Sequence, residues 1–176
     1  TVVAHVLADG IVSLVEGSVD IGGSRTAVAQ QLAEVLGIPV TDVMPTVADT
    51  DTIGYTSSSG GSGVAFKTGM AAYEAAHDIA RQRVDRAALV WDVPADQVEY
   101  ANGGLRHKSD PELRMAFKEI AGMLGETGGP VTGRASLHPT TSLGSYSANI
   151  VDVEVDPETG KVEILRLTAF QDAGTA

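Results

Sequence analysis

Alternating hydrophobic and polar positions near both ends of the chain predict antiparallel hairpins. Near the N-terminal end the alternation runs through residues 1–20 around Asp9-Gly10, a dipeptide typical of tight hairpin turns. Near the other end two apolar runs, residues 146–155 and 161–170, flank a turn that contains Pro157. The alternating pattern therefore predicts strands that pair with their neighbours in sequence.

Between these ends, two segments repeat their apolar positions every three to four residues, which predicts amphipathic helices. The first begins at Ser24, with Ser24 or Thr26 as the expected cap, and ends at Gly37. The second follows Gly63 and runs for more than about 20 residues, as far as Pro94. On the second helix His77 is interpreted as a packing residue rather than a catalytic base. The expected apolar face of the second helix consists of Phe66, Met70, Tyr73, His77, Ala80, Val84, Ala87 and Trp91.

The remaining segments predict shorter elements. Residues 42–48 are expected to form a short buried strand. The next four residues, Asp49-Thr-Asp-Thr52, could cap a turn or bind Mg²⁺, and the turn is preferred because no third carboxylate is near. A hairpin is predicted over 97–107, a short helix within 108–128, and a strand with a loop over 131–143. Together these elements predict an α+β fold of two layers, a mixed sheet with antiparallel hairpins and helices packed on one face.

Two junctions rich in glycine and serine lie directly before the two helices. Gly22-Gly23-Ser24 opens the first helix, and residues 57–63 open the second. The first N–H groups of a helix lack intrahelical partners and lie at the positive end of the helix dipole. Both junctions are therefore predicted to be main-chain cradles for an anion or a polar ligand. The alternative for the second junction is a flexible surface loop.

Composition and charge narrow the range of ligands. The 176 residues carry a formal net charge of −11, which argues against nucleic acid because phosphate backbones are bound mainly by Lys and Arg. The chain has no cysteine and four scattered histidines, which disfavours disulfides, Fe–S clusters and a metal held by the protein. It also lacks Gly-Lys-Ser/Thr and Gly-x-Gly-x-x-Gly, so a P-loop or Rossmann nucleotide site is a poor interpretation. With no long apolar run and no signal-peptide pattern, a cytoplasmic location without membrane contact is expected.

Several motifs, taken in order, resemble the molybdopterin-binding large subunit of the xanthine dehydrogenase and aldehyde oxidase family. Each motif is weak alone, but their order and spacing together are specific. The resemblance extends over essentially the whole chain, so it implies that residues 1–176 are part of a longer chain's second molybdenum-cofactor domain. The matching segments are residues 17–26, Gln30 with 33–39, 49–52, 60–62, 69–75, 153–160 and 171–174.

The resemblance implies that both junctions contact a molybdenum–molybdopterin cofactor. Gly22, Gly23 and Ser24 would lie near the metal, where the family usually has Gly-Gln-Gly, and the glutamine has no counterpart here. Gly60, Gly61 and Ser62 would offer backbone N–H groups and a hydroxyl to the pterin, and the arginine that often follows is replaced by Gly63. No catalytic residue and no protein ligand of the metal is expected in this chain, because the family's catalytic glutamate lies beyond its end.

The function implied by the resemblance is that of a molybdenum hydroxylase, which inserts a water-derived oxygen into an aldehyde, purine, N-heterocycle or related small substrate. The cofactor is expected in its cytosine dinucleotide form, and the electrons pass to Fe–S and FAD groups in partner subunits or domains. Without the remainder of the large subunit the chain is expected to be inactive and to self-associate through uncovered apolar surfaces. The alternative is a non-catalytic α+β binding or assembly domain in which both junctions are only tight turns.

Overall fold

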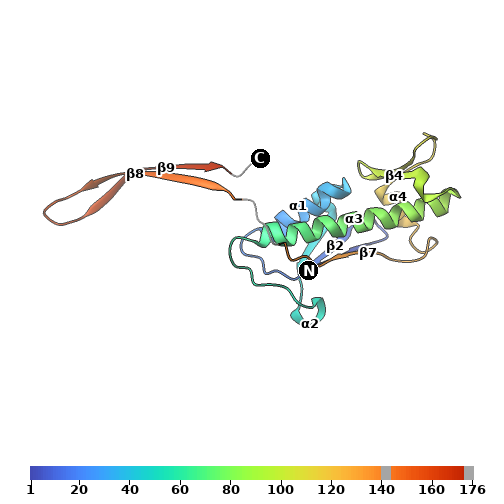
Figure 1. Ribbon diagram of the computed structural model, residues 1–176, viewed down its shortest axis with the longest axis horizontal. Helices are drawn as coiled ribbons and strands as arrows, with labels where there is room; N and C mark the ends of the chain where they lie inside the picture. The colour runs from blue at the N-terminus through green and yellow to red at the C-terminus, as the bar shows by residue number, and fades with distance from the viewer. Residues whose placement is uncertain (140–143, 173–176) are drawn as a thin grey trace. The chain divides into compact units, whose positions relative to one another are not determined.

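The chain divides into two units, Thr1–Pro139 and Thr140–Ala176. A computed structural model describes residues 1–139 and 144–172, shown in Figure 1. No helix in this described part of the chain combines the length and the hydrophobicity that crossing a membrane requires.

The first unit is built on a four-stranded mixed sheet with the strand order β3-β2-β1-β7. Strand β1 runs antiparallel to both of its neighbours, β2 and β7, while β2 and β3 are parallel. The predicted hairpin between β1 and β2 is confirmed, and its turn places Gly10 at a φ of 83°. The strands are β1 (Val2–Val6), β2 (Val12–Glu16), β3 (Val43–Val47) and β7 (Val131–Ala135).

Two helices, α1 (Ser24–Leu36) and α3 (Val64–Trp91), cover one face of this sheet. Alternate residues of β1 and β2 point toward the helices and form one core with them, whose fully buried members include Val2, Leu14 and Leu32. The remaining face of the sheet carries His5 and other residues that are half-buried or exposed. The predicted α+β architecture, a mixed sheet with helices on one face, is therefore confirmed.

The buried face of α3 is only partly the predicted one. In the second half of the helix Ala80 and Ala87 are buried, as expected. Met70 and Tyr73, assigned to the apolar face, are 36% and 43% exposed, whereas Ala75 and Ile79 are completely buried. The cause is close packing against β7, because a Cβ on Gly133 would lie only 2.1 Å from the backbone oxygen of Ala75. Only small residues allow such an approach, and a hydrophobicity pattern favours the larger ones instead. The packing role of His77 agrees with its edge-to-face contact with Tyr73, with ring centroids 4.4 Å apart.

The ends of α1 are only partly as predicted. Gly37 ends the helix in the left-handed conformation, with a φ of 62°, as expected. Neither Ser24 nor Thr26 caps the start, because the capping position is Gly23 and Ser24 is already the first helical residue. The capping prediction was wrong because an acidic side chain outside the helix, described below, takes the place of a capping hydroxyl.

The segment after α1 forms an edge strand rather than a buried one. A 3₁₀ turn (Val40–Asp42) leads into β3, where Val43 is buried but Met44 is 56% exposed. The strand predicted over 42–48 is confirmed as β3, but the prediction that it is buried was wrong: only Val43 is buried, and β3 has a neighbouring strand on one side only. The turn interpretation of the next four residues is confirmed: the Asp49 side chain accepts the Asp51 N–H and caps the short helix α2 (Thr50–Ile53).

A separate three-stranded sheet with the order β4-β5-β6 lies near the C-terminal half of α3. The hairpin predicted over 97–107 is confirmed, with Asn102 and Gly103 at positive φ in its turn. The helix predicted within 108–128 is confirmed only as α4, and a three-residue strand too short to show an alternating pattern precedes it. These elements are a 3₁₀ turn (Ala95–Gln97), β4 (Val98–Ala101), β5 (Gly104–His107), β6 (Arg114–Ala116) and α4 (Phe117–Gly122).

The second unit is the predicted C-terminal hairpin. Strands β8 (Tyr146–Val155) and β9 (Val162–Asp172) pair antiparallel, with one irregularity at Asp152/Val153. The turn closes through a hydrogen bond from the Gly160 N–H to the Asp156 carbonyl. Of the motif at 171–174, Ala173 and Gly174 lie outside the described residues.

Candidate functional site

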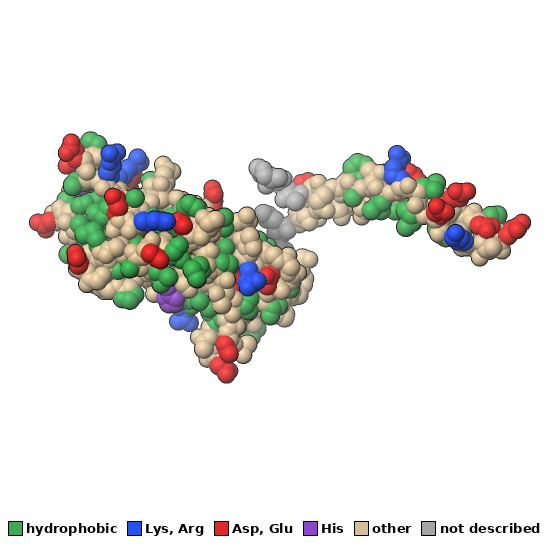
Figure 2. Space-filling view, turned by 180° about the vertical axis from the view of Figure 1, so that it is seen from behind, with side chains coloured by type: hydrophobic (Ala, Val, Ile, Leu, Met, Phe, Trp, Pro, Cys, Tyr) green, Lys and Arg blue, Asp and Glu red, His purple; other side chains and the backbone are tan. Residues whose placement is uncertain are grey.

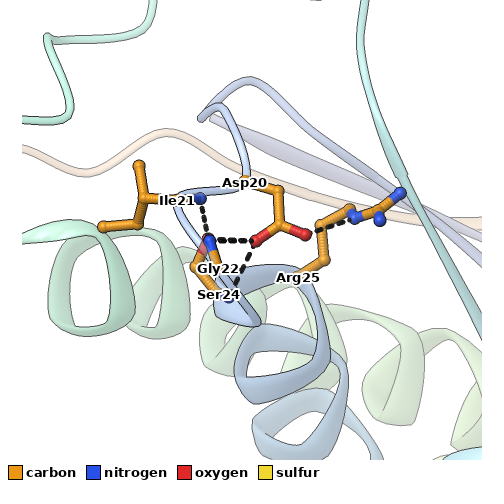
Figure 3. Close-up of polar contacts among 5 residues, drawn as sticks. All are labelled: Asp20, Ile21, Gly22, Ser24 and Arg25. Atoms are coloured by element: carbon orange, nitrogen blue, oxygen red, sulfur yellow. Dashed lines mark hydrogen bonds and ion pairs between the residues drawn. The ribbon is translucent and has the colours of Figure 1, made fainter.

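The first Gly/Ser junction is organised around the carboxylate of Asp20, as Figure 3 shows. One carboxylate oxygen accepts hydrogen bonds from the Gly22 N–H, the Ser24 N–H and the Ser24 hydroxyl, at 3.1, 2.9 and 3.0 Å. The other oxygen accepts from Nε of Arg25 at 2.9 Å. The Ser24 hydroxyl oxygen in turn accepts the Ile21 N–H at 3.2 Å. The turn is therefore held together by one acidic side chain.

This network changes what the first junction can bind. The hydrogen bond from Arg25, followed by those from Ser24 and Gly22, holds the pKa of Asp20 well below its usual range, so the carboxylate is charged. It already occupies the donors at the start of α1 where an external anion would sit. In the predicted main-chain cradle, the N–H groups of Gly22 and Ser24 are therefore already paired within the chain.

The glycines of this turn nevertheless leave room beside the backbone. Gly22 and Gly23 have φ of 107° and 90°, a region that residues with a Cβ rarely adopt. A Cβ built on either would meet no atom within 4 Å among the described residues. The turn can therefore approach a bulky group closely, although it is not an anion cradle.

The second Gly/Ser junction connects α2 to the first turn of α3. It places Gly61 and Ser62 at φ of 68° and 55° before Gly63 caps the helix. Ser62 adopts a conformation that is uncommon for any residue other than glycine, asparagine or aspartate. Among the described residues no side chain caps the start of α3, so the positive end of the dipole of this 28-residue helix faces the junction.

A hollow lies where this junction meets one end of the strands of the four-stranded sheet. At that end β2 and β7 end and β1 begins, since Val2 is paired with both Glu16 and Ala135. The lining includes hydroxyl side chains from this end of the sheet, from the junction and from α3, together with Lys67 and His138, and no carboxylate among the described residues. The hydroxyl-bearing residues that line it are Thr1, Ser18, Tyr55, Thr56, Ser57, Ser58, Thr68 and Ser136.

Some of these hydroxyls are fixed by hydrogen bonds to one another. Ser18 and Thr68, both buried, share a hydrogen bond of 2.6 Å between the end of β2 and α3. The Thr1 hydroxyl lies 2.8 Å from that of Ser136. The buried hydroxyl of Thr56 has no hydrogen-bond partner among the described residues. A buried hydroxyl without a partner is costly. This oxygen packs against Gly17, where an added Cβ would lie 2.0 Å from it.

Glu16 is the last residue of β2 and lies next to this end of the sheet. Its side chain is 1% exposed, and neither carboxylate oxygen has a hydrogen-bond partner among the described residues. Burial, and secondly the charge of Asp20, raise the pKa of Glu16 to about 7, opposed by Arg25 and the Thr1 ammonium. The carboxyl group is therefore half protonated near neutral pH.

The predicted site residues are not all brought together. Ser57, Ser58 and Gly63 line the hollow, whereas Gly60, Gly61 and Ser62 belong to the same junction without lining it. Gly22, Gly23 and Ser24 do not line it either. The sequence reasoning missed Ser18, Lys67, Thr68 and Ser136. Ser18 and Ser136 follow the ends of β2 and β7, and a hydroxyl just beyond a strand end was the signal that could have indicated them.

Comparison with known proteins gives the family. Residues 1–176 match the model of the molybdopterin cofactor-binding domain. The chain is 27% identical over 172 residues to the xanthine dehydrogenase molybdenum-binding subunit of Escherichia coli O157:H7, covering 94% of this chain and 23% of that protein. The structure of the Cu,Mo-CO dehydrogenase matches with a TM-score of 0.83 and 26% identity, over 99% of this chain and 23% of that one.

The fold is also that of quinoline 2-oxidoreductase from Pseudomonas putida 86, with a TM-score of 0.83 at 20% identity, over 99% of this chain and 23% of that one. In each comparison the chain spans less than a quarter of its relative's length. Among the described residues no group of His, Cys, Asp or Glu could hold a metal ion. From its match over the full sequence, the chain belongs to the molybdopterin cofactor-binding domain family.

Proposed function

We propose that residues 1–176 form part of the cofactor-binding domain of a molybdenum hydroxylase, and that the hollow at the start of α3 holds part of the molybdopterin cofactor. The observation that carries this proposal is the hydroxyl-rich lining around a helix start that no described side chain caps, in a chain that matches the cofactor-binding family throughout. The full protein would carry the remainder of the large subunit, including the catalytic glutamate.

The residues of the hollow fit a polar, phosphate-bearing group. Hydroxyls and the first N–H groups of α3 are hydrogen-bond donors, and Lys67 adds a positive charge one turn into the helix. The backbone and side chains of Ser57 and Ser58, which line the hollow, add further polar groups. The absence of a carboxylate from the described lining removes the main source of repulsion for an anion.

Each junction is assigned a different role. Gly60, Gly61 and Ser62 shape the backbone of the second junction, so that Ser57 and Ser58 face the hollow and donate to the cofactor. Gly22, Gly23 and Ser24 approach the cofactor closely without a Cβ in the way, since space is open beside both glycines. The charge of Asp20 is balanced by Arg25, which limits repulsion of an anionic group nearby.

When bound, the cofactor supplies the redox chemistry of hydroxylation with a water-derived oxygen, while this chain's residues bind and orient it. The proposed substrates are an aldehyde, a purine, an N-heterocycle or a related small molecule. The proposed cofactor form is the cytosine dinucleotide, the electron acceptors are Fe–S and FAD groups in partner subunits or domains, and the proposed location is the cytoplasm.

The test uses the full-length polypeptide that carries these residues, purified as wild type and as Lys67→Met. Molybdenum per chain is measured by mass spectrometry, and released pterin by fluorescence. We expect close to one molybdenum in the wild type and a several-fold loss in Lys67→Met. The matched control is Lys118→Met, because Lys118 pairs with Asp42 away from the hollow.

Two results would overturn the proposal. Equal molybdenum and pterin contents in Lys67→Met and in the control would mean that the hollow does not hold the cofactor. A wild-type polypeptide without molybdenum or pterin would leave the non-catalytic α+β binding domain as the better interpretation.

A further inference from the structure

The β8–β9 hairpin has two chemically different faces. In an antiparallel pair, residues directly opposite each other share a face, and successive residues alternate between faces. The register pairs Val151 with Leu167, Val153 with Ile164 and Val155 with Val162 on one face. This set, here called the aliphatic face, consists of Val151, Val153, Val155, Val162, Ile164 and Leu167.

The opposite face is polar at the same level of the hairpin. Asp152 and Arg166 are paired in the register and form an ion pair of 2.9 Å. Next to them Glu154 lies directly opposite Glu163, and two like charges in such positions destabilise a hairpin unless water solvates them. The polar face is therefore suited to solvent.

The aliphatic face is exposed in the described structure. Its six residues are between 43% and 68% exposed, and Figure 2 shows hydrophobic side chains uncovered along the hairpin. No third strand pairs with β8 or β9 among the described residues. A contiguous apolar surface of this kind marks an interaction site, and a two-stranded hairpin alone is marginally stable in water.

We propose that the aliphatic face is a docking surface for an uncharged, aliphatic layer in the remaining part of a longer molybdopterin-binding polypeptide. The stripe of six side chains offers neither charge nor hydrogen-bond donor, so its occupant is an apolar helix or sheet face. The solved CO dehydrogenase chain matches 99% of this chain, while this chain covers only 23% of it, so a relative of this kind has ample chain to supply that layer.

A second copy of this chain is the less favourable occupant. Acidic residues outnumber basic ones in the hairpin itself, so stacking two hairpins would bring like charges together. The acidic residues are Asp152, Glu154, Asp156, Glu158, Glu163 and Asp172, and the basic ones are Lys161 and Arg166. A segment of the same polypeptide avoids the entropy loss of bimolecular association. This inference depends on the proposed function only through the existence of the longer polypeptide, not through cofactor binding.

Cysteine labelling tests the inference directly, because the chain contains no cysteine of its own. Val153→Cys reports on the aliphatic face, and the adjacent Glu154→Cys is the matched control on the polar face. Ile164→Cys and Glu163→Cys repeat the comparison on β9, in case a substitution in β8 impairs folding. Each is reacted with a maleimide in the dilute 176-residue chain and in the full-length polypeptide, and the modified peptide is quantified by mass spectrometry.

In the full-length polypeptide we expect Val153→Cys and Ile164→Cys to react at about one tenth of their rate in the dilute 176-residue chain, or more slowly still. The polar-face controls should react at similar rates in both. Equal rates for the aliphatic face in both proteins would overturn the inference. Two further results would overturn it. Protection already present in the dilute 176-residue chain would mean that this chain covers the face itself. Protection of the full-length polypeptide that disappears on dilution would mean that a second copy covers it. Because labelling does not depend on molybdenum, its outcome is separate from that of the cofactor test.

Discussion

The substitution Gly133→Ala is expected to loosen the packing of α3 on the sheet. Gly133 lies in β7, and a Cβ on it would lie 2.1 Å from the backbone oxygen of Ala75, 2.9 Å from that residue's carbonyl carbon and 2.8 Å from Cγ1 of Ile79. The Ile79 side chain can rotate, but the Ala75 backbone belongs to a long helix and moves only with it. Relief of the contact therefore requires α3 and β7 to separate.

The size of the effect follows from this geometry. Cβ contacts shorter than 3.0 Å essentially never occur, so the oxygen must retreat by at least 3.0 − 2.1 = 0.9 Å. Such a shift opens gaps beside Ala75 and Ile79, both completely buried. Overpacking of a well-packed core costs typically 1–3 kcal/mol, and a backbone clash belongs at the upper end, about 2 to 3 kcal/mol.

Urea unfolding of the 176-residue chain, followed by circular dichroism, measures this loss. The control is Gly122→Ala, since Gly122 is an exposed residue of α4 where an added Cβ would meet no described atom within 4 Å, and alanine is the better helix former. We expect Gly122→Ala to match or exceed the wild type in stability. A loss below about 0.5 kcal/mol in Gly133→Ala, the level of an ordinary surface substitution, would refute the close packing of α3 on β7.

Three further substitutions test buried or partly buried charges. The pKa of Glu16 is about 7 in the folded chain, against a usual value of 4.5. Between pH 4.5 and 7 the folded state therefore binds more protons than the unfolded state. The free energy of unfolding falls by about 3 kcal/mol as the pH rises through that range. Urea midpoints at pH 4.5 and 8 should show this fall in the wild type and not in Glu16→Gln. Asp20→Ala removes the acceptor of the Gly22 and Ser24 N–H groups, so hydrogen exchange at these amides should accelerate and the melting temperature fall. Arg83 is buried with two guanidinium nitrogens unpartnered among the described residues, so Arg83→Met should stay within about 1 kcal/mol of the wild type, while Arg83→Ala should lose about 3 kcal/mol through the cavity.

Each of these expectations has a contrary result. A pH dependence in Glu16→Gln equal to that of the wild type would mean that Glu16 is solvated. Unchanged hydrogen exchange at the Gly22 and Ser24 amides in Asp20→Ala would mean that Asp20 is not their acceptor. The control is Asp78→Ala, because Asp78 forms an ion pair with Arg81 at the surface. Equal stability losses in both Arg83 variants would show that the charge itself stabilises the fold, through the contacts of the guanidinium with the ring and the carbonyl oxygen of Phe117.

The sequence was sufficient for features that depend on local geometry. The turns at Asp9-Gly10 and Asn102-Gly103 and the end of α1 at Gly37 all need positive φ, and glycine or asparagine marks each position. The face of α3 could not be predicted in this way, because a residue far away in the chain, Gly133, sets how closely the helix approaches the sheet. The three-residue strand β6 is also too short to carry a periodic signal.

The candidate site was predictable only where a single segment builds it. Residues 57–63 could be selected as a candidate from their composition and their position before a helix, and Ser57, Ser58 and Gly63 line the hollow. The rest of the hollow comes from strand ends and from α3, and the buried pair of Ser18 and Thr68 is separated by 50 positions. Which hydroxyls meet across such a distance depends on sheet order and helix orientation, which no local pattern contains.

The two junctions share the sequence Gly-Gly-Ser, but the residue two positions before it differs. Two residues before Gly22 stands Asp20, whose carboxylate reaches forward to the Gly22 and Ser24 N–H groups and fills the cradle from within the chain. Two residues before Gly60 stands Ser58, a neutral hydroxyl that lines the hollow instead. A carboxylate at the first junction makes it a rigid turn whose charge Arg25 balances, whereas a hydroxyl at the second leaves the helix dipole and Lys67 available to an anion. A chain with a net charge of −11 can thus offer a local site for a phosphate-bearing group without a basic surface, because the donors are hydroxyls and backbone N–H groups at one helix start.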